Sequence, residues 1–171
     1  MAGGISDLSK SINERIGEKA EELGPVEFMK VIGKNEYDLL GLLSMAANGS
    51  IEVKSELSNW NRVLQFKAQG AKSCYLKTGG GKMTAHLGDA QSPDITFETD
   101  SAEDLMGMLT GVMDGTSMYM SGKLRIEGQL SDAIKFGNLG QLLQKVLTND
   151  KILEIWELNP EDVAEKLGIQ P

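Results

Sequence analysis

The sequence predicts an α/β (α+β) fold in which five short strands are flanked by helices. From residue 62 to residue 98, apolar and polar residues alternate in several short runs, as on half-buried strands. Before and after this region, apolar residues recur every three or four positions, which is typical of amphipathic helices. Glycine-rich turns separate the first three strands, so we expect these strands to form an antiparallel meander.

Three helices are predicted ahead of the strands. The first, over residues 5–23, carries apolar residues on one face and charged residues on the other. Ser6 or Asp7 can cap its start, and Gly24-Pro25 ends it. A short second helix follows, and Asn35 can cap a third. The predicted ranges of these two helices are 26–33 and 36–47.

The sequence of residues 50–58 is compatible with either a strand or a helix. Ile51, Val53 and Leu57 alternate as on a strand, whereas Ser50 followed by Glu52 is typical of a helix start. We favour a short helix here. Three strands follow, and glycines in the turns between them supply the positive φ angles that hairpins need. The strands are predicted over residues 63–67, 73–78 and 82–87.

The second half of the chain predicts two more strands and further helices. Residues 95–98 form the fourth strand, and Ser101 can cap a helix that ends at Gly115. Residues 118–120 are expected to bridge this helix to a fifth strand over residues 124–127. A long or broken helix then spans residues 130–147, with glycines as its weak points. The last helix starts after Asn159 with Pro160 at its first position and ends at Gly168.

Composition and charge exclude several classes of function. The chain has 171 residues and a formal net charge of -8, which disfavours binding to nucleic acid and to anionic lipid surfaces. The single cysteine, Cys74, cannot form an intramolecular disulfide. No signal peptide and no membrane-spanning apolar run is present. We therefore expect a cytoplasmic protein with at most transient membrane contact.

No catalytic or metal-binding constellation can be assembled from the sequence. The only histidine, His86, falls on the polar side of its predicted strand, and Cys74 has no base beside it. The run Gly79–Lys82 joins two strands, so we interpret it as a hairpin turn rather than a phosphate-binding loop. We expect no cofactor and no enzymatic activity. Trp60 and Trp156 fit either a lipid entrance or a structural role, and we favour the structural role.

Methionines cluster between the fourth and fifth strands. Methionine is flexible and polarizable, so such a cluster suits an apolar surface that accepts ligands of differing shape. A methionine-rich core without a ligand is the alternative. The cluster comprises Met106, Met108, Met113, Met118 and Met120.

Residues 108–139 resemble the signature of the sterol carrier protein type 2 (SCP-2) domain family. The matching segments are Leu109-Thr110-Gly111, Gly122-Lys123-Leu124-Arg125-Ile126-Glu127-Gly128 and Lys135-Phe136-Gly137-Asn138-Leu139. A weaker similarity extends to residues 50–147. The resemblance implies a five-stranded, mainly antiparallel sheet covered by helices on one face, with an apolar cavity between them. It also implies binding of fatty acids, fatty acyl-CoA, phospholipids or sterols without a cofactor. We therefore expect a carrier of a fatty acyl, acyl-CoA, isoprenoid or sterol-like ligand.

On this basis we expect a single domain over residues 1–171, with a core over 50–147 and helical extensions over 1–49 and 148–171. The alternatives are a dimerisation or interaction module, including a homodimer, and an accessory subunit of an acyl-CoA enzyme. The residues predicted to line the lipid site are Phe97, Leu105, Met106, Leu109, Met113, Met118, Met120, Ile126, Ile134 and Leu143.

Overall fold

The computed structural model describes residues 11–169, and these fall into two compact units. Residues 35–147 form the sheet unit, whereas the segments on either side of it, up to residue 34 and from residue 148, form the helical unit. Each unit has its own core. The prediction of one domain with two extensions stays a prediction.

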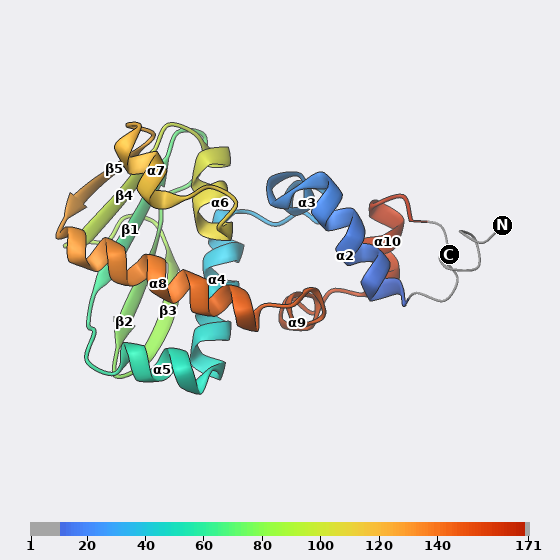
Figure 1. The fold of residues 1–171 in the computed structure, drawn as a ribbon, viewed down its shortest axis with the longest axis horizontal. Coiled ribbons are helices and arrows are strands. Elements are labelled where there is room, and N and C mark those ends of the chain that lie inside the picture. Colours follow the sequence, from blue (N-terminus) through green and yellow to red (C-terminus); the bar gives the residue numbers. More distant parts are fainter. Residues whose placement is uncertain (1–10, 170–171) are drawn as a thin grey trace. The chain divides into compact units, whose positions relative to one another are not determined.

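The sheet unit contains a five-stranded mixed sheet in the order β3-β2-β1-β4-β5 (Figure 1). Three of the four strand pairings are antiparallel, and β1 pairs with β4 in parallel. The predicted α/β class and the mainly antiparallel sheet are therefore confirmed. The strands are β1 (Val63–Ala68), β2 (Cys74–Gly79), β3 (Lys82–Leu87), β4 (Ile95–Thr99) and β5 (Leu124–Gly128).

The parallel pairing of β1 with β4 depends on polar contacts made by the segment between β3 and β4. The buried Gln65 amide donates to the carbonyl oxygens of Cys74 and Gly88 and accepts from the backbone N–H of Ala90. The Asp94 carboxylate accepts a hydrogen bond of 2.8 Å from the backbone N–H of Val63. These contacts hold the segment between β3 and β4 against β1, so β4 joins the sheet beside β1.

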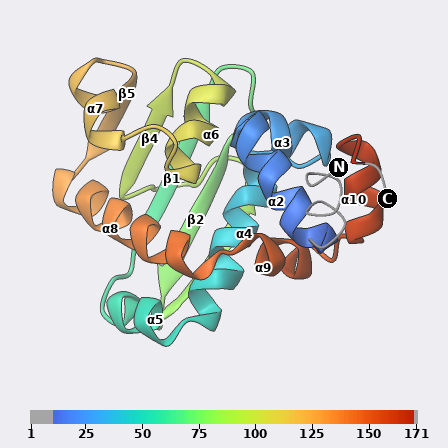
Figure 2. The same ribbon diagram turned by 45° about the vertical axis from the view of Figure 1, so that its right-hand side comes forward.

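Helices cover one face of this sheet (Figures 1 and 2). Alternation along the strands turns residues such as Leu64 and Leu76 toward the helices, while Lys77, Thr84 and Glu98 lie on the other face. The buried aliphatic side chains between sheet and helices form the core. The helices are α4 (Glu36–Gly49), α5 (Ile51–Leu57), α6 (Ala102–Thr110), α7 (Gly115–Met120) and α8 (Leu130–Val146).

Three of these helices refine the sequence-based predictions. Residues 51–57 are helical, as favoured, because Ser50 caps the helix through the Val53 N–H. The bridge predicted at residues 118–120 belongs to a helix, α7, because the Asp114 carboxylate accepts hydrogen bonds from the backbone N–H and the hydroxyl of Ser117. These hydrogen bonds lower the pKa of Asp114. Helix α8 is continuous, so its two internal glycines do not break it.

The helical unit combines segments from both sides of the sheet unit. Its helices are α2 (Ile12–Leu23), α3 (Pro25–Val31), α9 (Asn149–Ile155) and α10 (Pro160–Lys166). Helix α9 was not predicted. The buried core consists of Ile16, Ile32, Leu153, Val163, Ala164 and Leu167.

The ends of these helices follow local capping rules. Asn159 caps α10 as expected, through the N–H of Glu161, with Pro160 at the first helical position. Ser11 caps α2, and the predicted caps Ser6 and Asp7 lie outside the described residues. Trp156 is half-buried against this core, with the Lys34 ammonium 5.5 Å from its ring centroid. Within residues 11–169, no helix is both long and apolar enough to cross a bilayer.

Candidate functional site

The two central strands place two phenylalanine rings side by side beneath α8. Phe66 of β1 and Phe97 of β4 are partners in the parallel register, so both side chains point to the same face. Their ring centroids are 5.2 Å apart and their planes differ by 8°. Both side chains are buried. We call Phe66 and Phe97 the aromatic floor.

Helix α8 lays a third ring on this floor. The centroid of Phe136 is 5.4 Å from that of Phe66 and 5.5 Å from that of Phe97, and its plane is tilted by 52° and 45° respectively. Phe136 is only half-buried. Leu139 and Leu143, three and seven positions later on the same face, are fully buried. The helix therefore closes over the core along its second half and less completely at Phe136.

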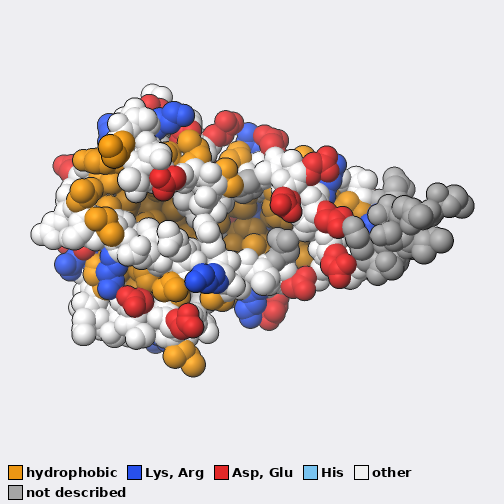
Figure 3. Space-filling view, viewed as in Figure 1, with side chains coloured by type: hydrophobic (Ala, Val, Ile, Leu, Met, Phe, Trp, Pro, Cys, Tyr) orange, Lys and Arg blue, Asp and Glu red, His pale blue; other side chains and the backbone are white. Residues whose placement is uncertain are grey.

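Large hydrophobic side chains are exposed around α7 and the start of α8. Met120 and Ile134 are 80% and 60% exposed. Both helices contact β5, so these side chains belong to the same end of the sheet unit. In Figure 3, hydrophobic side chains gather over this end and also lie in a recess between α8 and the segment that joins α6 to α7. We call the exposed residues the apolar rim: Val112, Tyr119, Met120, Leu130 and Ile134.

The start of α8 is apolar on two sides. Leu130 and Ile134 are four positions apart and share one face of the helix, whereas Phe136 lies on the face toward the sheet. A helix that is apolar on several sides is normally covered on all of them. The exposed side is therefore suited to contact with another apolar surface.

Two methionines belong to the loop after α6 and to α7, beside residues of the apolar rim. Met118 is buried in α7, and Met113 packs against α6 at Gly107. A Cβ atom at Gly107 would lie 2.6 Å from the Met113 sulfur, so the glycine provides the space for this side chain. Ile126, the partner of Phe97 on the edge strand β5, is half-buried.

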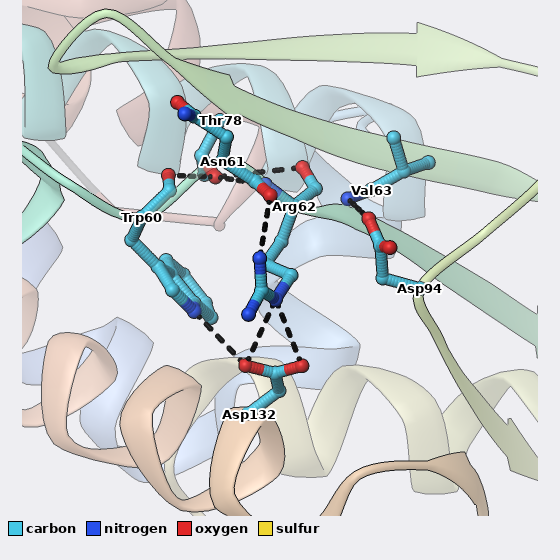
Figure 4. A network of polar contacts seen from close by, with 7 residues as sticks. All are labelled: Trp60, Asn61, Arg62, Val63, Thr78, Asp94 and Asp132. Atoms are coloured by element: carbon cyan, nitrogen blue, oxygen red, sulfur yellow. Dashed lines mark hydrogen bonds and ion pairs between the residues drawn. The ribbon is translucent and has the colours of Figure 1, made fainter.

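A buried carboxylate fixes the first turn of α8 to the sheet (Figure 4). Asp132 is 6% exposed and accepts a hydrogen bond of 3.0 Å from the indole N–H of Trp60. The Arg62 Nε donates to both carboxylate oxygens of Asp132, at 3.2 and 3.0 Å. Thr78 holds the other side of this network by donating to the Trp60 carbonyl at 2.6 Å. Trp60 is thus buried in a structural network, and the first turn of α8 has a defined position over β1.

Two glycines allow close contacts around the same helix. Gly128 ends β5 with φ +124°, and a Cβ there would lie 2.5 Å from the Asp94 carbonyl oxygen. Gly111 ends α6 in the left-handed region, where a Cβ would overlap the amide of Gln144. Gln144 donates to the Thr110 carbonyl oxygen at 3.2 Å and so links α8 to α6. Both glycines belong to the segments that suggested the family in the sequence.

A polar cavity of about 330 Å³ lies at the ends of β1, β4 and β5. Arg125 borders it and forms ion pairs with Glu98 and Asp100 at 3.1 and 2.9 Å. The hydrogen bonds that Arg125 donates to Asp100 and Glu98 raise the pKa of its guanidinium. This cavity is lined by paired charges and does not suit a hydrocarbon tail.

The ten predicted lipid-site residues occupy three environments. Met113 and Ile126 are half-buried, and Met120 and Ile134 are exposed members of the apolar rim. Their contact with a lipid stays a prediction. The remaining six are buried: Phe97, Leu105, Met106, Leu109, Met118 and Leu143.

Sequence reasoning missed Phe66 and Phe136 as members of the site. Phe66 alternates with the polar Gln65 and Lys67 in a predicted strand, so its orientation was available from the pattern. Phe136 shares a helical face with Leu139 and Leu143, which the spacing also shows. The Trp60–Asp132 contact joins positions 72 residues apart and leaves no local signal.

Comparison with known proteins gives the family. Residues 43–141 match the model of the SCP-2 sterol transfer family. The chain belongs to the SCP-2 sterol transfer family. This match covers the whole sheet, all of α5, α6 and α7, and most of α8. The Asp132 network, the aromatic floor and the apolar rim are therefore features of the SCP-2 part of the chain.

Related proteins agree with the family and the fold. The chain is 36% identical over 66 residues to the peroxisomal multifunctional enzyme A of Dictyostelium discoideum, but this alignment spans 39% of the chain and only 14% of that enzyme. The solved UbiJ-SCP2 ubiquinone synthesis protein is similar over 62% of this chain and 92% of its own, with 20% identity and a TM-score of 0.53. A conserved hypothetical protein of Thermus thermophilus is similar over 69% and 86%, with 20% identity and a TM-score of 0.50. At these identities the structural neighbours show the SCP-2 fold alone.

Proposed function

We propose that the protein is a lipid carrier that holds one hydrophobic tail beneath the start of α8, beside the aromatic floor. The ligand classes are fatty acyl chains, acyl-CoA, isoprenoids and sterol-like molecules. The observation that carries this proposal is the apolar rim beside half-buried Ile126 and Phe136, because solvent-exposed hydrophobic groups gather where the covered face is least closed. Membership of the SCP-2 sterol transfer family supports the same proposal.

The energetics favour broad selectivity and moderate affinity. Burying about 16 methylenes at ~0.8 kcal/mol each gives roughly 13 kcal/mol before costs. Association and ordering cost about 4–15 kcal/mol, so micromolar binding is the expected range. Because burial of hydrocarbon is not directional, tails of similar length should compete with one another. The apolar rim then supplies transient membrane contact during exchange, while the polar headgroup stays in water.

A second candidate function is a non-catalytic interaction module. The exposed face of Leu130 and Ile134 on α8 favours it, because a partner surface would cover these side chains as well as a lipid would. The partner we propose is an enzyme that acts on acyl-CoA, and similarity to part of the peroxisomal multifunctional enzyme A supports association with an enzyme. We propose that the chain itself is not an enzyme. Thioester hydrolysis by the isolated protein would contradict this.

Displacement of a fluorescent fatty acid by a panel of lipids tests the proposal. We expect saturable uptake with micromolar dissociation constants and competition by long-chain fatty acids or acyl-CoA. Met113→Glu should weaken uptake at least tenfold, because a carboxylate would replace a half-buried apolar side chain of the proposed lipid site. Glu98→Gln, on the opposite face of the sheet, is the matched control and should bind as the wild type does. Absence of uptake by the wild-type protein, together with a ligand-free dimer, would favour the interaction module instead.

A further inference from the structure

We infer that Phe136 sets the length of lipid tail that the protein accepts. This inference rests on the proposed function and adds a specificity-determining residue to it. Phe136 is the most exposed of the three rings at the aromatic floor, and it touches both of the others. It therefore covers the rings that a tail would otherwise meet.

Across the sheet, perpendicular to the strands, side chains are less buried on one side of Phe136 than on the other. On the β5 side, Ile126 is half-buried beside Phe97. On the β2 side, Cys74 pairs with Phe66 and is fully buried. Phe136 lies over the Phe66–Phe97 pair, at the point where the half-covered edge of the sheet gives way to the closed core.

Burial changes in the same way along α8. Residues Leu139 and Leu143 follow Phe136 on the same face and are fully buried. Leu64 of β1 and Leu105 of α6 are also fully buried, so the core of the unit is closed on this side of Phe136. A tail that passes over Ile126 therefore meets the Phe136 ring before it can reach this core. The ring ends the accessible path unless it rotates.

Side-chain rotation at Phe136 is the step that would lengthen the path. The ring is not fixed by hydrogen bonds, and its half-exposed position leaves it room to move. By contrast, the Asp132 network four positions earlier fixes the backbone of α8. The depth available to a tail should therefore depend on the size of side chain 136 while the helix stays in place.

The test compares tail-length profiles of variants at this position. Dissociation constants for octanoate, dodecanoate and palmitate are measured by displacement of a fluorescent fatty acid. Phe136→Ala and Phe136→Leu should raise affinity for palmitate relative to octanoate, by about tenfold for Ala, the effect of roughly two more buried methylenes. Phe136→Trp should change this ratio in the opposite direction.

The matched control is Phe28→Ala, which removes a half-buried ring from α3 of the helical unit. It should leave the palmitate-to-octanoate ratio unchanged. If the wild-type protein binds these probes but all Phe136 variants keep its ratio, the inference is wrong and the proposed function stands. If the wild-type protein binds none of them, the proposed function fails and the inference fails with it. Phe136→Leu and Phe136→Trp keep an apolar side chain, so the ratio can be read even if Phe136→Ala does not fold.

Discussion

Asp132 is the residue on which the position of α8 depends most directly. Its carboxylate is buried and accepts hydrogen bonds from Trp60 and Arg62. Asp132→Ala would leave a buried indole N–H and a partly buried guanidinium without this partner, so we expect a loss of about 2–4 kcal/mol in the free energy of unfolding. Urea denaturation measures this. Asp100→Asn, in an exposed ion pair with Arg125, should cost less than about 1 kcal/mol. Equal effects of the two substitutions would contradict the role given to Asp132.

Cys74 predicts a pH dependence of stability. Burial, with a further contribution from the nearby Glu36 charge, raises the pKa of its thiol from 9.0 to about 12. Above pH 9 the unfolded thiol ionises while the folded one keeps its proton, so the folded state should lose stability as the pH rises from about 9 toward 12. The difference in unfolding free energy between the wild type and Cys74→Ala should therefore shrink between about pH 9 and pH 11. If this difference in unfolding free energy stayed constant, burial would not be keeping the Cys74 thiol protonated in the folded state.

At the scale of elements, Gly128 and Gly137 should respond in opposite ways to a methyl group. Gly128 has φ +124° and a backbone oxygen 2.5 Å from the position of a Cβ, so Gly128→Ala should destabilise the protein by more than about 2 kcal/mol. Gly137 lies inside α8 with nothing within 4 Å of a Cβ, so Gly137→Ala should stabilise it by about 0.5–1 kcal/mol. Thermal unfolding of both variants measures the difference. If Gly128→Ala stabilised the protein, the close approach of β5 to β4 would not be the reason for a glycine at this position.

Local sequence signals predicted most of the helices and strands but not the contacts between them. Alternation and glycine turns predicted the five strands, and the Ser50 and Asn159 caps predicted two helix starts. Helix α7 was missed because six residues give too little periodicity, although Asp114 followed by Ser117 is a capping signal. The parallel pairing of β1 with β4 depends on the contact of Gln65 with Ala90 and on that of Asp94 with Val63, which lies 31 residues earlier in the chain. The aromatic floor follows from that register, so it could not be placed from the sequence.

At the scale of the whole molecule, lipid binding should belong to the sheet unit. Residues 35–147 contain the aromatic floor, the apolar rim and the Asp132 network, whereas the helical unit has a separate core. A fragment of residues 35–147 should therefore keep the fatty acid affinity of the full chain within about threefold, a difference of less than about 1 kcal/mol. Fluorescence displacement with both proteins tests this. A folded fragment that binds no lipid would assign part of the site to the helical unit.

The most direct measurement uses a fatty acid that carries a nitroxide near its methyl end, with methyl NMR spectra of the protein recorded before and after reduction of the label. If a tail lies beneath the start of α8, beside the aromatic floor, the methyl signals of Ile126 and Met118 should broaden strongly and recover on reduction. Leu87, on the opposite edge strand β3 of the same sheet, serves as the reference and should broaden much less. Sharp signals at Ile126 and Met118 with a saturating fatty acid, or broadening confined to the helical unit, would contradict the account.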